Sequence, residues 1–416
     1  MVLRKQWVWL LLAALLTAAG AGVWLLQGGV HAEGDGPSES LRTVLEVISL
    51  IKTQYVDDVD ALTLISNYVE SGTINGMLAA TLDDPYTRYM DPQAFRQVQI
   101  DVQGEYGGIG IMVGIKDGKL TIIAPFEGTP GYEAGLRPGD RIVSIDGRPT
   151  ERMSLDEAVS LMRGPEGTSI ALGIQRGEGE PFEVEVVRNT IQVPSVTEVR
   201  YFEKGTLEDQ EYPVGYIRLQ RFSERTEEEL FDALDRLYSA QPAGLILDLR
   251  DNPGGTLSAA IDVANAFLPD GPILHIVGRD GAKRTVYAFP VKKYPLQPMV
   301  VLVNEYTASA SEIVSGALQD RGVAKLVGMT TFGKGLVQTV VPLRDGSALS
   351  LTSARYQTAG GRFIHETGIV PDLVVAMPTT DDGLPVVVER LEEDPQFLSA
   401  VRLLMQEIQQ RHQAAM

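Results

Sequence analysis

The sequence predicts a multidomain protein of mixed α+β and α/β class. Three observations support this prediction. A chain of 416 residues is long enough for two or three domains, each with its own core. Its composition, 44% hydrophobic and 22% charged with 42 Gly and 23 Pro, is that of a globular protein with many turns. Along the chain, the apolar pattern changes from a helical period to short β runs and then to alternating strands and helices.

These changes divide the chain into five predicted regions. The regions are residues 1–32 (membrane anchor or signal segment), 33–96 (N-terminal helices), 97–190 (a compact β-rich module), 191–378 (an α/β core) and 379–416 (C-terminal helices). We expect the β-rich module and the α/β core to have separate hydrophobic cores.

Composition excludes several classes of function. The 36 Lys and Arg against 55 Asp and Glu give a net charge of −19, which argues against nucleic acid and anionic membrane surfaces as partners. The absence of cysteine excludes thiol nucleophiles, thiolate zinc sites and disulfides. The four histidines show no metal-ligand spacing, so we expect no metal site.

A targeting segment opens the chain. Arg4 and Lys5 precede an uncharged run from Trp7 to Leu26, long enough to cross about 30 Å of hydrocarbon. Because the basic residues lie on its N-terminal side, the positive-inside rule leaves residues 33–416 outside the cytoplasm. A small-residue pattern ending at Ala32 also fits a cleavage site. We expect an extracytoplasmic protein anchored to the bacterial cell membrane by this helix, or a secreted or periplasmic protein if the segment is cleaved.

Two helical stretches follow the polar linker at residues 33–40. The first carries four apolar residues at helical spacing: Val44, Val47, Ile48 and Ile51. The second is predicted from Ala61 to Leu82, and Asp83-Asp84-Pro85 ends it.

The β-rich module contains one clear helix, Ser154 to Met162, among short strands and Gly turns. A glycine-rich strand entry would explain GGIGIMV (Gly107–Val113) by itself, and the absence of GxGxxG argues against a dinucleotide loop. Together with EAGLRPGDRIVSIDG (Glu133–Gly147), however, the module closely resembles a PDZ domain. The resemblance implies that its loop binds a peptide's C-terminal carboxylate and that apolar residues line the pocket for the terminal side chain. The loop residues are Gly108, Ile109, Gly110 and Ile111, and the pocket residues are Ile109, Ile111, Val159 and Met162.

The next region alternates strands with helices. We predict strands at Val214–Leu219, Gly244–Arg250 and Pro298–Val303 and a helix at Thr226–Leu237. The last two strands end in polar loops, at the sheet edge where sites of α/β proteins cluster. The final segment, Gly383 to Met416, is predicted to be largely helical, with an apolar face that includes Leu404.

Ser309 lies at a turn between a strand and a helix. With Glu312 three residues later it forms a capping box, which explains both residues without any chemistry. The same position would also expose a nucleophile and place helix N-terminal N–H groups beside a developing oxyanion.

Lys334 lies between two glycines in TTFGKG (Thr330–Gly335). A solvated turn lysine is the simple explanation, but a buried lysine with a lowered pKa could act as the base of a Ser-Lys protease. Four residues later, Gln338 projects to the same face of a predicted strand and could orient the amine. A third loop, LRDNPGG (Leu249–Gly255), is either a tight turn or an anion-binding nest.

The three loops, in this order and spacing, closely resemble those of the carboxyl-terminal processing peptidases, also called tail-specific proteases. INGMLAATLDDPYTRYM (Ile74–Met90) and LTSARYQTAGGRFIHETGIVPD (Leu351–Asp372) look like other blocks of that family. The resemblance covers about residues 40–378. It implies a ClpP/crotonase-like protease core in which Ser309 is the nucleophile, Lys334 the general base and Gln338 the support of the lysine.

The resemblance also implies the remaining parts of the enzyme. Backbone N–H groups of Gly254 or Gly255 and of Ala310 would form the oxyanion hole, and no cofactor is needed. The PDZ domain would bind C-terminal tails of protein substrates, with Arg163 as a candidate link to the catalytic region. Some relatives dimerise through terminal helices, and the apolar faces near Ile48 and Leu404 would permit a homodimer.

Two alternatives stay open at this point. A Ser-His-Asp protease would need His275 or His365 beside the nucleophile. A noncatalytic PDZ scaffold or adaptor at the cell surface would need only the capping-box explanation of Ser309.

Overall fold

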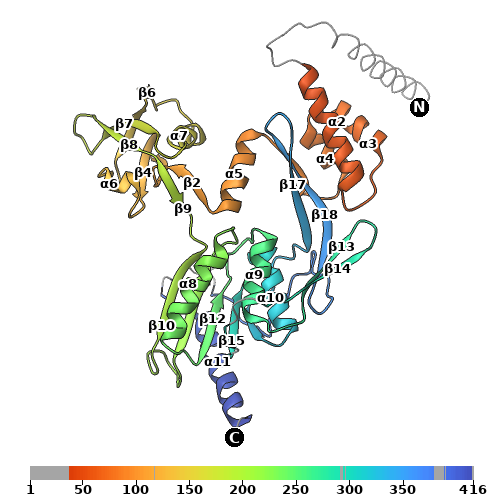
Figure 1. Ribbon diagram of the computed structural model, residues 1–416. Helices are drawn as coiled ribbons and strands as arrows, with labels where there is room; N and C mark the ends of the chain where they lie inside the picture. The colour runs from red at the N-terminus through yellow and green to blue at the C-terminus, as the bar shows by residue number, and fades with distance from the viewer. Residues whose placement is uncertain are drawn as a thin grey trace. The chain divides into compact units, whose positions relative to one another are not determined.

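A computed structural model describes residues 37–116, 118–290, 294–295, 297–378, 388 and 390–414 (Figure 1). The described residues up to Val47 and those from Ile48 onward belong to separate compact units, and the PDZ-like module, the α/β core and the site described below lie in the second unit. The predicted anchor, Trp7–Leu26, lies outside the described residues, and within them no helix is long and apolar enough to cross a membrane.

The N-terminal helices differ from the prediction at one point. Helix α2 (Pro37–Gln54) buries Val44, Val47, Ile48 and Ile51, which confirms the predicted face. The helical region predicted over 61–82 is present but consists of two helices: α3 (Ala61–Ser71) ends at Gly72 with φ 71°, and α4 (Ile74–Thr81) starts anew with Thr73 as its N-cap. A left-handed glycine followed by a capping threonine stops one helix and starts the next.

The segment after α4 carries two elements that the periodicity did not reveal. Strand β1 (Arg88–Met90) pairs with β18 (Ala348–Thr358) of the core. Helix α5 (Pro92–Gln103) starts at the N-cap Asp91 and ends at the left-handed Gly104, so it runs across the predicted boundary at residue 97. Residues 84–103 thereby reach the neighbourhood of the core's second sheet.

The PDZ-like module is an antiparallel sheet in the order β3-β4-β5-β7-β8, with β6 paired to β5. Its strands are β3 (Ile111–Lys116), β4 (Lys119–Pro125), β5 (Arg141–Ile145), β6 (Arg148–Pro149), β7 (Ser169–Gln175) and β8 (Phe182–Val187). The predicted helix is α7 (Leu155–Met162), which Ser154 caps, and a one-turn helix α6 spans Pro130–Glu133. A separate ribbon pairs β2 (Glu105–Gly108) with β9 (Asn189–Gln192).

The α/β core contains a sheet in the order β10-β11-β12-β15-β16-β19, parallel except for the β10-β11 pair. Its strands are β10 (Val196–Phe202), β11 (Val214–Leu219), β12 (Gly244–Asp248), β15 (Met299–Val303), β16 (Ala324–Gly328) and β19 (Leu373–Val374). The three predicted strands and the predicted helix, now α8 (Thr226–Ser239), are confirmed. Since β12 and β15 are neighbours and parallel, the loops that follow them meet at one edge.

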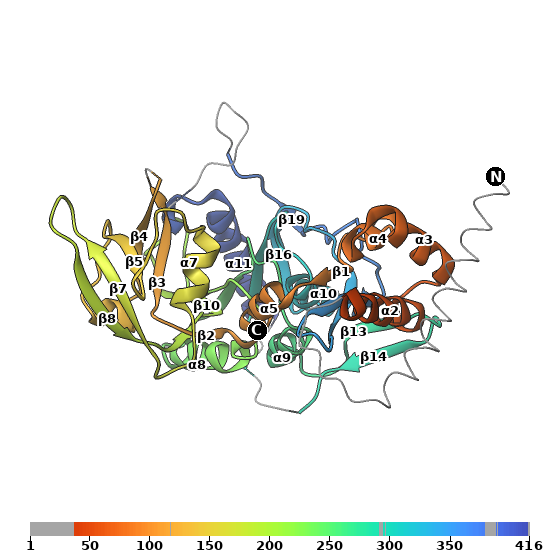
Figure 2. The same ribbon diagram turned by 90° about the horizontal axis from the view of Figure 1, so that it is seen from above.

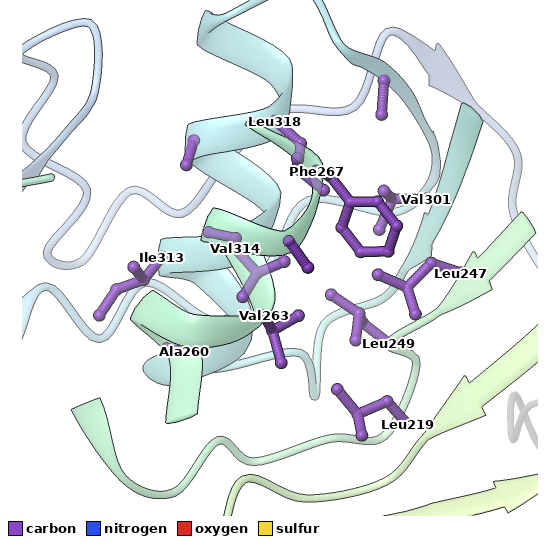
Figure 3. Packing of buried hydrophobic residues seen from close by; sticks show 14 of the residues in the cluster. Leu219, Leu247, Leu249, Ala260, Val263, Phe267, Val301, Ile313, Val314 and Leu318 are labelled. Carbon is purple, nitrogen blue, oxygen red and sulfur yellow. The ribbon is translucent and has the colours of Figure 1, made fainter. Parts of the chain in front are cut away.

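Helices cover both faces of this sheet (Figure 2). Odd-numbered residues such as Leu247 and Val301 pack with α8, α9 (Leu257–Phe267) and α10 (Ala310–Asp320), as Figure 3 shows for α9 and α10. Even-numbered residues such as Ile246 and Val300 pack with α11 (Pro395–Ala414). Burial of both faces explains why these strands are continuous apolar runs.

The packing of α11 corrects one expectation. Leu404 is fully buried against the chain's own sheet, so the apolar face expected to serve a homodimer is already covered. A 3₁₀ turn, η1 (Leu391–Glu393), precedes α11.

The second core sheet is antiparallel and carries the lysine loop. Its order is β1-β18-β13-β14, with β17 also paired to β18. Its other strands are β13 (Pro272–Gly278), β14 (Lys283–Tyr287) and β17 (Leu336–Pro342). Lys334 lies just before β17, and Gln338 lies within it.

Candidate active site

One cleft of about 860 Å³ brings the three predicted loops together. All six residues predicted for catalysis and the oxyanion hole line it: Ser309, Lys334, Gln338, Gly254, Gly255 and Ala310. Neither His275 nor His365 is among its lining residues within the described part of the chain. His275 bonds to Thr285 on β14, and His365 contacts the Gly333 carbonyl, so the Ser-His-Asp alternative has no support here.

Ser309 lies at a strained turn. Its φ of 55° and ψ of −114° are rare for a residue with a side chain. The Tyr356 hydroxyl donates to its carbonyl oxygen at 3.1 Å, and the Thr307 hydroxyl donates to the Leu249 carbonyl oxygen at 2.9 Å. The Thr307 bond joins the serine turn at the end of β15 to the glycine loop at the end of β12, and the Tyr356 bond joins it to β18.

Glu312 connects the serine turn to the lysine loop. The glutamate half of the predicted capping box is present, with the Ser309 N–H donating to the Glu312 carboxylate at 2.8 Å. The same carboxylate also accepts the N–H groups of Gly333 (2.8 Å) and Lys334 (2.9 Å) and the Thr331 hydroxyl (2.5 Å). Glu312 is fully buried. Sequence reasoning explained this glutamate as a local cap and missed its long-range partners, because nothing in the spacing links position 312 to position 333.

The Lys334 amine is enclosed on several sides. Its Nζ donates to Gln338 Oε1 at 2.8 Å and lies 4.5 Å from the centroid of the Tyr86 ring. Burial lowers the pKa of Lys334, Arg88 lowers it further, and Asp84 and Glu312 act in the opposite direction. The net lowering increases the fraction of neutral amine, the form that can accept a proton.

The predicted Lys334–Gln338 contact is present, but the argument from strand period is wrong. Lys334 precedes β17, and the register of β17 against β18 shifts between Val337 and Gln338. The contact depends on the loop and the bulge, and Gln338 Nε2 donates to the Tyr86 carbonyl at 2.9 Å, which orients Oε1 toward the lysine. Among the hydrogen bonds of the described residues, none joins the Ser309 hydroxyl to the Lys334 amine.

The glycine loop packs directly on the serine turn. A Cβ on Gly254, whose φ is 99°, would lie 2.9 Å from both Ser309 Cβ and the Ala310 nitrogen. The Asn252 carbonyl accepts the Ala308 N–H and the Ser311 hydroxyl, each at 3.0 Å. Asn252 Oδ1 accepts the Gly254 N–H at 2.9 Å. Of the two glycines predicted for the oxyanion hole, Gly254 thus already donates its N–H to Asn252. Within the described residues the Gly255 N–H has no such acceptor.

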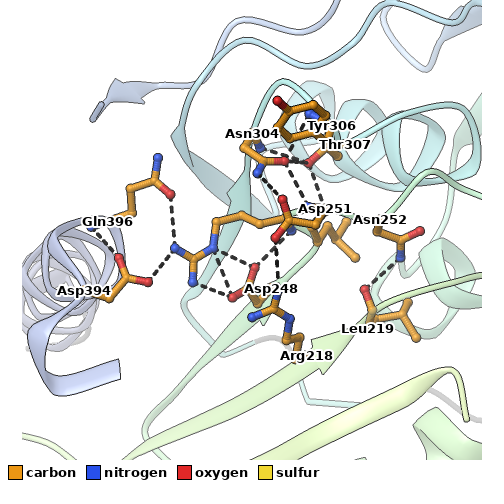
Figure 4. A network of polar contacts seen from close by, with 12 residues as sticks. Arg218, Leu219, Asp248, Asp251, Asn252, Asn304, Tyr306, Thr307, Asp394 and Gln396 are labelled. Atoms are coloured by element: carbon orange, nitrogen blue, oxygen red, sulfur yellow. Dashed lines mark hydrogen bonds and ion pairs between the residues drawn. The ribbon is translucent and has the colours of Figure 1, made fainter. Parts of the chain in front are cut away.

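A buried ionic network supports the start of this loop (Figure 4). Arg250 pairs with Asp248 at 2.7 Å and with Asp394, which precedes α11, at 2.6 Å. The Tyr216 hydroxyl also donates to Asp248. Burial alone would raise the pKa of Asp248, but Arg250 more than offsets this and keeps the carboxylate ionised. Sequence reasoning missed Arg250 and Asp394, which lie 144 positions apart.

The PDZ residues occupy a different part of the molecule from the cleft. Ile109 and Met162 are buried in the module's own core, while Ile111 and Val159 are half-buried beside them. Gly108 ends β2, and Gly110 lies in the turn before β3 with φ 69°. Strand β3 pairs only with β4 among the described strands and therefore has a free edge near α7.

Arg163 lies outside the catalytic cleft. Its Nη1 donates to Gln97 Oε1 on α5 at 2.6 Å, and its guanidinium lies 4.9 Å from the Tyr106 ring centroid. On the same helix, Val98 and Asp101 line the catalytic cleft. The structure thus connects Arg163 to the cleft through α5 rather than by direct contact.

Comparison with known proteins agrees with this architecture. Residues 213–375 match the model for peptidase family S41, residues 122–176 a PDZ domain, and residues 27–94 the N-terminal domain of the activating protease CtpB. The chain is 39% identical to a carboxyl-terminal-processing protease of Synechocystis, over 85% of this chain and 86% of the relative. It is 36% identical to carboxy-terminal processing protease CtpB of Bacillus subtilis, over 86% of this chain and 74% of that protein.

A solved structure shows the same fold. The photosystem II D1 C-terminal processing protease is 30% identical, with a TM-score of 0.52, over 82% of this chain and 95% of that one. Three loops that are far apart in the sequence meet in one cleft. Together with these matches, this arrangement argues against the alternative of a noncatalytic PDZ scaffold. The chain belongs to the C-terminal processing serine proteases of peptidase family S41 and contains a PDZ domain.

Proposed function

We propose that this protein is an extracytoplasmic endopeptidase that uses a Ser309–Lys334 dyad. The observation that carries the proposal is the lysine amine, which lies in the same cleft as Ser309 with its pKa lowered by burial. The Ser309 hydroxyl attacks a substrate carbonyl while Lys334 takes its proton. The Gly255 and Ala310 N–H groups, with Gly254 as the alternative glycine, stabilise the oxyanion, and water then hydrolyses the acyl-enzyme. No cofactor takes part.

Gln338 has a defined role in this mechanism. A neutral amine has one lone pair, which must point at the serine hydroxyl to accept its proton. Because one of its N–H groups donates to Gln338 Oε1, the amine has fewer orientations available. This restriction helps to direct its lone pair at the serine. Since no hydrogen bond of the described residues joins Lys334 to the Ser309 hydroxyl, the mechanism requires one of these two side chains to rotate before proton transfer.

Paired substitutions in the full chain test the dyad. Ser309→Ala and Lys334→Ala are each expected to lower kcat/KM for an unstructured protein with an apolar C-terminus by roughly 10³-fold or more. The matched controls are Ser239→Ala and Lys204→Ala, which change exposed residues outside the cleft and should keep parental activity. Thermal unfolding of each variant checks its fold. Cleavage that survives either cleft substitution would place the nucleophile or the base elsewhere.

The PDZ domain is proposed to select the C-terminal tails of substrates. The tail would add as a strand along the free edge of β3, with its carboxylate at the Gly108–Ile111 loop and its last side chain near Val159. A substrate with an amidated C-terminus should be cleaved about tenfold more slowly than the free acid, because it cannot place a carboxylate in the loop. Val159→Asp should remove the difference between the two substrates. Equal cleavage of both substrates by the parent would contradict tail recognition.

Arg163 is proposed to transmit tail binding to the cleft through α5. Arg163→Ala breaks the bond to Gln97 and should abolish the stimulation that a tail confers, while cleavage of a tail-amidated substrate is retained. Arg148→Ala, which removes an exposed ion pair to Glu157 on α7, is the control. Unchanged stimulation in Arg163→Ala would remove this residue from the mechanism.

The cellular location and the oligomeric state form the last part of the proposal. Washing membranes without detergent should leave an anchored protein in the membrane fraction, whereas a cleaved form is released. A homodimer would need surfaces other than the buried Leu404 face, and sedimentation of the purified chain tests it.

A further inference from the structure

Tyr86 contacts both the proposed base, Lys334, and the glutamine that accepts a hydrogen bond from it, Gln338. The Lys334 Nζ lies 4.5 Å from the centroid of its ring, and its carbonyl oxygen accepts Gln338 Nε2 at 2.9 Å. Tyr86 lies in the N-terminal region, ahead of β1. It precedes Gln338 by 252 positions in the sequence. The ring is half-buried, and its hydroxyl has no hydrogen bond within the described residues.

The position of the ring is fixed by its own turn. Asp84 accepts the Tyr86 N–H at 2.9 Å and the Thr87 hydroxyl at 2.6 Å. The Thr352 N–H of β18 donates to the Thr87 hydroxyl at 3.0 Å, which joins this turn to the second core sheet. These bonds fix the backbone of the turn that carries Tyr86, so its ring faces the lysine as a preorganised group.

We infer that Tyr86 stabilises the ammonium that forms on Lys334 when Ser309 gives up its proton. The inference rests on the proposed Ser-Lys mechanism. In that step the Oγ–H bond of Ser309 breaks and the proton bonds to Nζ. The freed electron pair of Oγ forms the bond to the substrate carbonyl carbon, and the π pair of the carbonyl moves onto its oxygen to form the oxyanion. A unit positive charge therefore appears on an amine that is largely removed from water. An aromatic face attracts a cation more strongly than a neutral amine, so the ring favours the transition state over the ground state.

Other charged groups face the same amine or the same ring. Asp84, Glu312 and Arg88 act on Lys334, and Glu366 acts on Tyr86. The His365 ring contacts the Tyr86 ring edge-on, with centroids 6.5 Å apart. Because the His365 imidazole contacts the Tyr86 ring directly, it needs its own control in any pH experiment.

Two substitutions in the full chain isolate the ring from the hydroxyl. Tyr86→Phe keeps the aromatic face and should follow the parent in kcat/KM from pH 5 to 10. Tyr86→Leu removes it and should lower the plateau of kcat/KM by about 3- to 30-fold. The acidic limb should also move to lower pH by about 0.5 to 1.5 pH units, because the protonated lysine loses its stabilising partner. Repeating both substitutions in a His365→Gln background should leave the difference between Leu and Phe unchanged.

The pKa of the Lys334 amine provides a second readout that does not depend on activity. In a Ser309→Ala background with isotopically labelled lysine, the resonance of Lys334 can be assigned against Ser309→Ala/Lys334→Ala and titrated by NMR. Tyr86→Leu should lower this pKa and Tyr86→Phe should leave it unchanged. If the Leu variant does not fold, ring-fluorinated phenylalanines at position 86 retain the shape while weakening the ring's attraction for a cation, and they carry the same prediction.

The two ways of failing are distinct. If Tyr86→Leu matches Tyr86→Phe in pH profile and in lysine titration, Tyr86 has no electrostatic role and the inference is overturned. If Lys334→Ala retains activity, the dyad itself fails, whatever Tyr86 does.

Discussion

The catalytic cleft and the PDZ domain are stabilised in contrasting ways. Around the cleft, Glu312, Asn252 and Asp248 are fully buried, and each makes a hydrogen bond to a residue on a different element of the fold. The PDZ domain has fewer such bonds, made mainly by Asp140 and Arg188, around an apolar cluster that includes Ile122, Ile145 and Leu172. Directional bonds define positions to within tenths of an ångström, whereas burial of apolar surface mainly stabilises the fold. Substitutions in the cleft should therefore affect activity most, and substitutions in the PDZ domain should affect stability and tail recognition.

The largest effect is expected at Glu312. Glu312→Ala leaves four donors in a buried site without an acceptor, at a cost of roughly 3–5 kcal/mol in the free energy of unfolding. It also separates the serine turn from the lysine loop, so kcat/KM should fall at least 10³-fold. Kinetics and thermal unfolding measure the two effects. Glu305→Gln, an exposed glutamate seven residues earlier, is the control. If kcat/KM of Glu312→Ala stays within tenfold of the parent value, the serine turn and the lysine loop keep their relative position without Glu312.

A methyl group on Gly254 should have the next largest effect. Gly254→Ala places Cβ 2.9 Å from Ser309 Cβ in a backbone conformation that alanine disfavours, and we expect about a 10²-fold loss of kcat/KM. Gly361→Ala is a matched control, because Gly361 also has a positive φ, 83°, but has no atom within 4 Å of the added Cβ. Equal effects of the two variants on activity would attribute the loss to backbone strain and not to contact with the nucleophile.

Lys334 should make stability depend on pH in a predictable direction. Its pKa is lowered in the folded state, so the unfolded chain binds more protons between the two pKa values and stability rises with pH in that window. Lys334→Met should therefore raise the melting temperature at neutral pH by a few degrees and lose this advantage as the pH approaches the ordinary pKa of lysine. Calorimetry of both proteins across this range is the measurement. If the difference in melting temperature between the two proteins does not change with pH, burial does not lower the pKa of Lys334.

The smallest effect on catalysis is expected from the ion pair between the buried Asp140 and the partly exposed Arg176 of the PDZ domain. Asp140 accepts from the Arg176 guanidinium and from the Arg137 N–H, and these contacts offset burial and lower its pKa. Its stabilising contribution is present above the ordinary pKa of aspartate and is lost as the pH falls through the lowered one. Asp140→Asn should weaken tail-dependent stimulation, while cleavage of a tail-amidated substrate changes by less than about twofold. A large loss with the amidated substrate would show that the two regions do not act separately.

Local sequence patterns predicted much of the fold. Strands β11, β12 and β15 and helices α7 and α8 lie where apolar period and caps place them, because both signals act over a few neighbouring residues. The break between α3 and α4 was missed, although Gly72 and Thr73 carry a local signal for it.

The candidate site likewise contains residues that the sequence predicted and residues that it did not. Motifs predicted that Ser309, Lys334 and the NPGG turn belong together, and the structure places them around one cleft. Spacing could not identify Tyr86 beneath the lysine, Glu312 between the loops or Asp394 behind Arg250. These partners are brought together by the pairing of β1 with β18 and by the packing of α11 on the sheet. Amino-acid order thus determined which chemical groups are available and the local turns that expose them. Only tertiary packing decided which distant groups surround them, because contacts between residues 22 to 252 positions apart leave no periodic trace in one sequence.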